Sequence, residues 1–123
     1  MNTLEIKNIN ENTTLMLDMD GTILDLAYDS HIWLKLIPSI YADNMNISID
    51  DASSILQKKV SKMGSSLKWY CIDHWSELLG IDILRVHELE KDKIRYLPGA
   101  ESFLKKVSKS EIRAILVTNS HRD

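Results

Sequence analysis

The sequence predicts an α/β fold in which two short parallel strands are separated by a long helical stretch. Thr14–Leu17 is an apolar run that ends abruptly at Asp18, and residues 112–117 form a β-branched run that ends at Thr118. Apolar runs of this length, closed by polar turn residues, are typical of strands buried on both faces of a parallel sheet. Because parallel strands need a crossover connection, the helical residues between the two runs favour the same fold class.

Helical spacing dominates the interval between the two runs. Apolar residues recur at helical intervals over residues 29–41, and Pro38 predicts a kink or a division of that helix. Ser48 predicts the N-cap of a second helix, which we expect to end near Gly64. The same spacing predicts further helices over residues 67–78, 82–95 and 100–109.

Composition and charge exclude several classes of function. The chain has 123 residues, of which 44% are hydrophobic and 27% are charged, enough apolar material for one compact domain. A net charge of −3 provides no electrostatic footprint for nucleic acid or an anionic membrane. The single cysteine, Cys71, excludes an internal disulfide and a cysteine-based zinc site. No apolar run approaches the ~20 residues that cross a bilayer, and residues 1–8 lack the pattern of a signal peptide. We therefore expect a cytoplasmic protein.

Two carboxylates follow the first predicted strand. Asp18 and Asp20 lie two residues apart at its end, and Gly21 permits a tight turn there. Ligands of open parallel sheets bind beyond the carboxyl ends of the strands, so both side chains can face one pocket. One ionised carboxylate can attack an electrophile and bind Mg²⁺ while the other moves a proton. The alternative is that these acids only form a turn and cap a helix.

The same residues carry a resemblance to a known family. Residues 18–25, Asp-Met-Asp-Gly-Thr-Ile-Leu-Asp, resemble the first motif of the haloacid dehalogenase-like phosphohydrolase superfamily, and residues 116–119 resemble its second motif. Residues 17–38, 67–83 and 115–121 resemble, more narrowly, the bacterial GMP/IMP nucleotidases of that superfamily. The resemblance implies a Rossmann-like core of parallel strands, here truncated, with an inserted helical cap.

The resemblance also implies roles for particular residues. Asp18 would be the nucleophile that forms an aspartyl-phosphate, and it would also bind Mg²⁺. Asp20 would be the general acid and base and, through its backbone carbonyl, a second Mg²⁺ ligand. Thr118, with the backbone amides around Asn119 and Gly21, would hold the phosphoryl oxygens. The implied activity is hydrolysis of phosphomonoesters, with purine monophosphates such as GMP and IMP as substrates.

The interval between the motifs matches superfamily members with a helical cap after the first strand. Thr118 follows Asp18 by 100 residues, which is too long for one crossover helix. We expect residues 1–27 and 96–123 to form the partial core and residues 28–95 to form the cap. Candidates for recognising a purine are five cap residues: Trp69, Tyr70, Asp73, His74 and Trp75. The alternative is that this aromatic stripe is the packed core of the cap.

Two parts of the superfamily's site are not expected in this chain. The resemblance implies a lysine and a downstream acidic pair after the second strand, whereas Lys105, Lys106 and Lys109 precede it. We therefore expect an N-terminal fragment of a longer phosphatase, with an incomplete site. Alternatives are a sugar-phosphate phosphatase or phosphoglucomutase-like member, and a non-catalytic remnant or half of a split protein. In the last case, an open sheet edge would bind a partner or a second copy.

Overall fold

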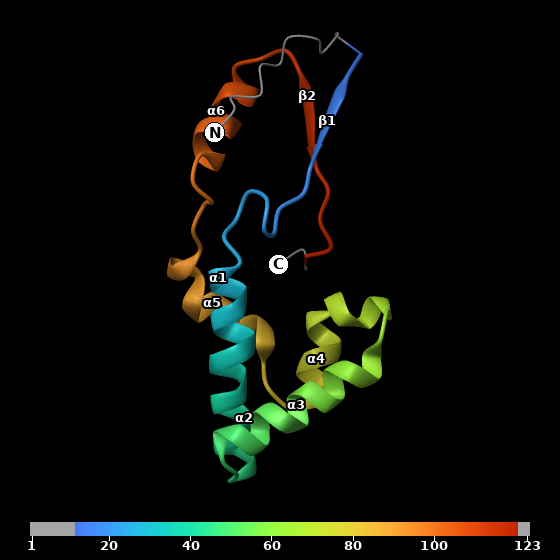
Figure 1. The fold of residues 1–123 in the computed structure, drawn as a ribbon, viewed down its shortest axis with the longest axis vertical. Helices are drawn as coiled ribbons and strands as arrows, with labels where there is room; N and C mark the ends of the chain where they lie inside the picture. The colour runs from blue at the N-terminus through green and yellow to red at the C-terminus, as the bar shows by residue number, and fades with distance from the viewer. Residues whose placement is uncertain (1–11, 121–123) are drawn as a thin grey trace. The chain divides into compact units, whose positions relative to one another are not determined.

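The structure, a computed structural model, describes residues 12–120 and divides them into two compact units (Figure 1). We call residues 12–25 with Tyr96–Thr118 the sheet unit, and Leu26–Arg95 with residues 119–120 the helical unit. The sequence-based division into core (1–27 and 96–123) and cap (28–95) stays a prediction, and its residues 1–11 and 121–123 lie outside the described residues.

Strands and helices follow the predicted order, which confirms the α/β class. The elements are β1 (Thr14–Leu17), α1 (Ala27–His31), the π-helix η1 (Ile32–Leu36), α2 (Ile37–Met45), α3 (Ile49–Met63), the 3₁₀ helix η2 (Leu67–Tyr70), α4 (Ile72–Leu79), α5 (Ile83–Glu90), the 3₁₀ helix η3 (Lys91–Lys93), α6 (Ala100–Ser108) and β2 (Arg113–Leu116).

In the sheet unit, β1 and β2 pair in parallel, as the two apolar runs predict. The register places Thr14 opposite Arg113 and Leu17 opposite Leu116. The expectation that both strands are buried on both faces is wrong for the described residues. Met16 is 65% exposed, and all four residues of β2 are exposed. The reason is that this sheet has two strands, too few to cover both of their faces and edges.

In the helical unit, α1, η1 and α2 follow one another without a break (Figure 1). Pro38, at the second position of α2, does not divide the helix as predicted. A proline has no N–H to donate and crowds the preceding turn. Here the turn before it is a π-helix, and Leu36 and Ile37 keep helical backbone angles across the junction.

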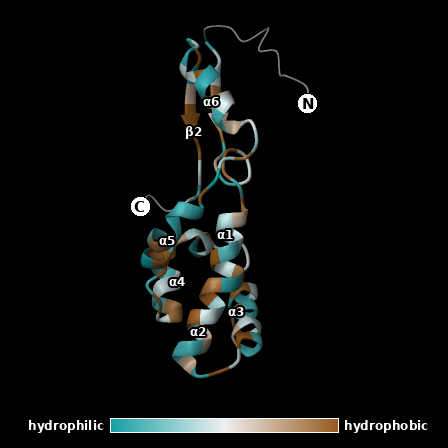
Figure 2. Cartoon of the chain, turned by 90° about the vertical axis from the view of Figure 1, so that its left-hand side faces the viewer, coloured by the Kyte–Doolittle hydropathy of each residue, from teal (hydrophilic) through white to brown (hydrophobic). Residues whose placement is uncertain are grey.

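The buried core of the helical unit consists of side chains from η1 through α5, and the partly buried Tyr28 of α1 packs against it. Ile32, Ile37 and Ile83 are completely buried, and Trp75 is 3% exposed. The other buried members are Tyr41, Ala42, Ala52, Leu56, Leu79, Ile81 and Val86. Figure 2 shows hydrophobic and hydrophilic residues alternating around α1, α2 and α3, the pattern of helices with one buried face.

Local signals determine where these helices begin and end. The Ser48 hydroxyl accepts a hydrogen bond from the Asp51 amide at 3.1 Å, which confirms the predicted N-cap of α3. The single helix predicted over residues 67–78 is wrong, because extended backbone at Cys71 separates η2 from α4. At this break, the Trp69 carbonyl accepts the Trp75 indole N–H at 2.9 Å.

Polar contacts join α1 to the end of α5. The Tyr28 hydroxyl donates to the His87 carbonyl at 2.9 Å, and burial raises the pKa of this phenol, with further contributions from Asp29 and Glu90. The Glu90 carboxylate forms an ion pair with Lys93, and it lies 3.5 Å from the Nε2 atom of His31. A hydrogen bond from Lys93 is the largest cause that lowers the pKa of Glu90.

Over residues 12–120, no helix is both long enough and apolar enough to cross a membrane.

Replacing Ile37 with alanine is expected to lower the free energy of unfolding by about 2–5 kcal/mol, because it removes a completely buried side chain. Leu34→Ala is a matched control from the preceding turn, where the side chain is 72% exposed. The control should change the free energy of unfolding by less than about 0.5 kcal/mol. Urea unfolding followed by far-UV circular dichroism measures both, and equal losses would contradict the assigned core.

Glu90→Gln is expected to lower stability at neutral pH and to have less effect in acid. Because the folded pKa of Glu90 is depressed, its contribution is present above the unfolded pKa and is lost as pH falls through the folded pKa. The difference in urea midpoint between wild type and variant should therefore shrink below the ordinary glutamate value of 4.5. In a Lys93→Met background, which removes the largest cause, the pH dependence should weaken. A difference that grows in acid would contradict the assignment.

Candidate functional site

The loop that follows β1 is a tight turn organised around one backbone carbonyl. The Met19 carbonyl accepts the amides of Thr22, Ile23 and Leu24 at 3.3, 2.9 and 3.0 Å. The Gly21 amide donates to the Leu24 carbonyl at 2.9 Å, and Gly21 has a positive φ of 77°, which favours glycine. These backbone bonds determine the path of residues 18–24, which carry the predicted carboxylates.

Both predicted catalytic carboxylates are exposed in this loop. Asp18 directly follows β1, and its Oδ2 accepts a long hydrogen bond of 3.5 Å from the Thr22 hydroxyl. Asp20 lies two residues on and forms an isolated bridge with Leu24. The sequence motif contains Thr22, but the sequence analysis assigned it no role. Its position four residues after Asp18, across the glycine turn, could have indicated that the two side chains make contact.

The parallel register brings the two motifs together. Since Leu17 lies opposite Leu116, and the Val117 amide donates to the Leu17 carbonyl at 2.7 Å, pairing continues one residue beyond β2. Asp18 and the exposed Thr118 therefore leave the same edge of the sheet within one residue of the same level. This is the edge at which parallel sheets bind ligands. Asn119 is also exposed, and it groups with the helical unit.

The Gly21 amide, which is predicted to bind phosphate, already donates a hydrogen bond within the turn. The acceptor in this conformation is the Leu24 carbonyl. Phosphate binding by that amide would require the turn to give up this bond. The structure thus supports a role for Gly21 in forming the turn, and its contact with phosphate stays a prediction.

The donor chemistry of the loop fits Mg²⁺. This ion prefers hard oxygen ligands and commonly takes one or two carboxylates together with phosphate oxygens and water. The predicted ligands are the Asp18 carboxylate and the Asp20 backbone carbonyl, and both residues are exposed in one loop. Across residues 12–120, no group of three or more His, Cys, Asp or Glu side chains comes together as a fuller metal site. These two residues could therefore hold Mg²⁺ as part of a shell that needs further oxygen ligands.

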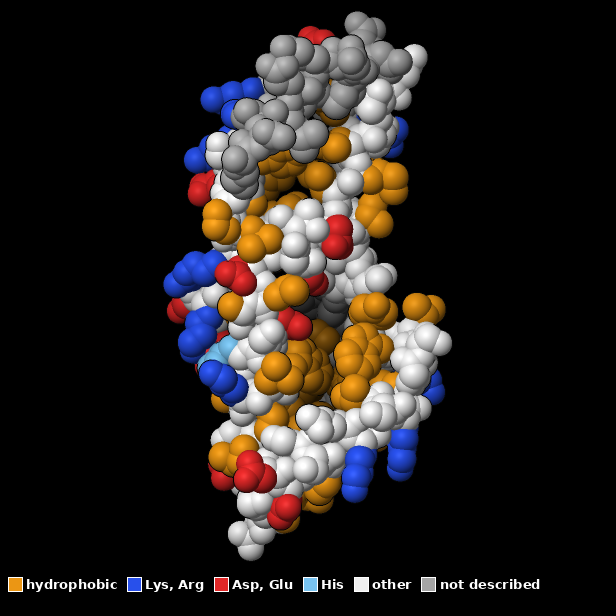
Figure 3. Space-filling view, viewed as in Figure 1, with side chains coloured by type: hydrophobic (Ala, Val, Ile, Leu, Met, Phe, Trp, Pro, Cys, Tyr) orange, Lys and Arg blue, Asp and Glu red, His pale blue; other side chains and the backbone are white. Residues whose placement is uncertain are grey.

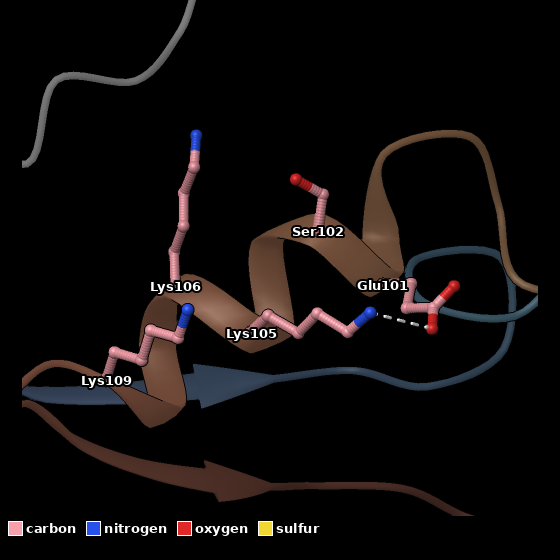
Figure 4. Close-up of a pocket in the computed structure, with 5 residues that line it drawn as sticks. All are labelled: Glu101, Ser102, Lys105, Lys106 and Lys109. Carbon is pink, nitrogen blue, oxygen red and sulfur yellow. Dashed lines mark ion pairs between the residues drawn. The ribbon is translucent and has the colours of Figure 1, made fainter.

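An open pocket lies along α6, and its lining includes none of the predicted site residues (Figure 4). It is lined by Glu101, Ser102, Lys105, Lys106 and Lys109. Lys105 and Glu101 form an ion pair of 3.3 Å one helical turn apart. The three lysines are exposed, as is typical of a solvated helix face.

The aromatic stripe of the helical unit divides into buried and exposed parts. Trp75 is in the core, so its selection as a substrate contact is wrong for this conformation. Trp69 and Tyr70 are 43% and 48% exposed. Asp73 is exposed and His74 is half-buried, both in the first turn of α4. The exposed members remain candidates for ligand contact.

Gly21→Ala is expected to destabilise the loop by about 1–2 kcal/mol. With the positive φ of this position, the Cβ of an alanine comes too close to the carbonyl oxygen that follows it. Gly21→Asn is the matched control, since asparagine tolerates this conformation. Amide hydrogen exchange at Leu24, whose N–H bonds to the Met19 carbonyl, measures the effect. Exchange should be faster in Gly21→Ala than in Gly21→Asn, and equal rates would show that the turn does not depend on the positive φ.

Comparisons with curated proteins and solved structures identify proteins that this chain is similar to. No family model matches the chain. The chain is 34% identical over 108 residues to the GMP/IMP nucleotidase YrfG of Escherichia coli (strain K12) and to that of Shigella flexneri. The matches cover 88% of this chain and 49% of each nucleotidase, so the chain spans about half the length of these relatives.

A solved structure shares the fold. The HAD phosphatase (a haloacid dehalogenase-like phosphatase) from Thermococcus onnurineus superimposes with a TM-score of 0.66 at 20% sequence identity, over 89% of this chain and 51% of that one. Fold, first motif and sequence similarity agree: the chain is similar to haloacid dehalogenase-like phosphatases and nucleotidases.

Proposed function

We propose that the loop of Asp18, Asp20 and Thr22, with Thr118 beside it, is the phosphate-processing site of a Mg²⁺-dependent phosphomonoester hydrolase. The observation that carries the proposal is the parallel register, which places two carboxylates and a threonine at one edge of the sheet. The similarity to GMP/IMP nucleotidases supports a 5′-nucleotidase acting on purine monophosphates.

In the proposed reaction, an Asp18 carboxylate oxygen attacks phosphorus while the bond from phosphorus to the nucleoside 5′ oxygen breaks. Asp20 donates its proton to that leaving oxygen. Asp20 then takes a proton from a water molecule whose oxygen attacks phosphorus, and the bond to Asp18 breaks. Phosphate leaves, and both aspartates return to their starting states.

Three further residues are proposed to orient Asp18 and the phosphate, namely Thr22, Thr118 and Asn119. The Thr22 hydroxyl holds the Asp18 carboxylate by its hydrogen bond. The Thr118 hydroxyl and the Asn119 amide are donors suited to phosphoryl oxygens. Mg²⁺, held by Asp18 and Asp20, would neutralise negative charge on the phosphate.

The remaining parts of such a site would come from elsewhere. The chain spans about half of each relative. We propose that the lysine and acidic pair implied by the family belong to the other half. The lysines of the α6 pocket are not proposed for this role, because they precede β2. A cytoplasmic location is kept as part of the proposal, supported by the composition.

The exposed members of the aromatic stripe are proposed to recognise the purine. They are Trp69, Tyr70, Asp73 and, half-buried, His74. Guanine and hypoxanthine share an N1–H donor that adenine lacks, and a carboxylate such as that of Asp73 can accept it. This chemistry favours GMP and IMP over AMP.

Two alternative functions remain. The first is a sugar-phosphate phosphatase or phosphoglucomutase-like enzyme with the same loop. The second is a non-catalytic remnant that binds a partner or a second copy through the sheet, and the exposure of Met16, Ile115, Leu116 and Val117 favours it.

A complementation assay tests these proposals. In Mg²⁺, the chain alone is expected to release little or no phosphate from GMP or IMP. Mixed with the unmatched half of the Escherichia coli nucleotidase, it should co-elute with that half and hydrolyse GMP and IMP faster than sugar phosphates. Removing Mg²⁺ with a chelator, or introducing Asp18→Asn, should reduce hydrolysis to background. Asp43→Asn, at an exposed position on α2, is the matched control and should leave the rate unchanged.

Each contrary outcome identifies a different error. Robust turnover by the chain alone, abolished by Asp18→Asn, would contradict the expected incomplete site. Faster hydrolysis of sugar phosphates than of purine monophosphates would favour the first alternative. Co-elution without hydrolysis would favour the partner-binding remnant.

A further inference from the structure

The 3₁₀ helix η2 exposes two aromatic side chains on the surface of the helical unit. Trp69 and Tyr70 are 43% and 48% exposed, although large aromatic side chains usually bury most of their area. Figure 3 shows that hydrophobic side chains gather on one face of the helical unit. In that view they lie between the helices α1 and α2 on one side and the segment from α3 to α4 on the other. Trp69 thus offers ring surface that the core does not use.

Trp69 contacts the buried Trp75 through a hydrogen bond and through its ring. The Trp75 indole N–H donates to the Trp69 carbonyl at 2.9 Å, and the two rings meet edge to face with centroids 6.0 Å apart. Trp75 in turn packs edge to face against Trp33 of the π-helix η1, with centroids 5.5 Å apart. Trp69 is therefore the outer end of a chain of three indoles whose middle member is fixed in the core.

The Trp69 indole, which is positioned by Trp75 and partly exposed, can bind a flat ligand on its ring surface. Aromatic rings stack on nucleobases through their faces, whereas a sugar ring offers no flat π-surface. Preorganisation by Trp75 reduces the ordering cost of binding. A purine is thus better matched to Trp69 than the sugar of a sugar phosphate.

We propose that Trp69 stacks the purine ring of the nucleotide and that Trp75 is a positioning residue which holds Trp69 through its indole N–H. This inference rests on the proposed nucleotidase function and adds a stacking role for Trp69 and a positioning role for Trp75. It assigns the base contact to the helical unit alone, so it can be tested with a nucleoside that carries no phosphate.

The test is an NMR titration of the 123-residue chain with GMP, guanosine and ribose 5-phosphate, following the three indole N–H signals. GMP and guanosine should shift the Trp69 signal, and ribose 5-phosphate should not. Trp69→Ala should weaken guanosine binding by about 5- to 150-fold, the range expected for loss of one stacking contact. Trp69→Phe, which keeps a flat ring, should restore most of the binding.

Two further variants separate stacking from general hydrophobic contact. Trp75→Phe keeps an aromatic ring in the core but removes the N–H donor. It should weaken guanosine binding with the helical circular dichroism signal retained. Leu67→Ala, at an 81% exposed position of the same 3₁₀ helix, is the matched control and should bind guanosine normally. Equal losses in Leu67→Ala and Trp69→Ala would overturn the proposal in favour of a protein-docking surface.

Failure of this inference is distinguishable from failure of the proposed function. If the complemented enzyme hydrolyses GMP and Trp69→Ala changes neither its KM nor guanosine binding, the stacking role is wrong and the nucleotidase stands. If guanosine shifts the Trp69 signal but no phosphomonoester is hydrolysed, the base contact stands and the nucleotidase proposal fails.

Discussion

The parallel pairing of β1 with β2 is the constraint on which the rest of the chain depends. Parallel neighbours cannot be joined by a hairpin, so the helical stretch between them has to leave the sheet and return. The register of Leu17 with Leu116 then brings together Asp18 and Thr118, which lie 100 residues apart in the sequence. The pairing of these two strands thereby assembles the candidate site.

The conformation of the loop after β1 depends more on backbone hydrogen bonds than on its acidic side chains. The Met19 carbonyl accepts three amides, and the Gly21 amide closes the turn on Leu24. With the path of the chain determined in this way, Asp18 and Asp20 remain exposed and the Thr22 hydroxyl reaches Asp18. In the proposed reaction, a preorganised loop of this kind favours catalysis, since little reorganisation is needed when the substrate binds.

Local signals in the sequence were sufficient for much of the fold. The run Thr14–Leu17 and the cap at Ser48 were predicted correctly, because both depend on residues within a few positions of each other. The π-helix before Pro38 and the break at Cys71 were not predicted. The break accompanies a bond between the Trp75 side chain and the Trp69 carbonyl, a choice that helical spacing cannot reveal. In the site, the aspartates followed from the motif, whereas the engaged Gly21 amide did not.

The linear order of residues was enough to indicate the α/β class, the carboxylate pair and its resemblance to a known family, because each depends on a short motif at the end of an apolar run. Only the tertiary structure separated the aromatic stripe into a buried Trp75 and an exposed Trp69 and Tyr70. It also showed that the apolar residues of β2 are uncovered. Burial depends on which segments pack against a side chain, and those neighbours are distant in the sequence.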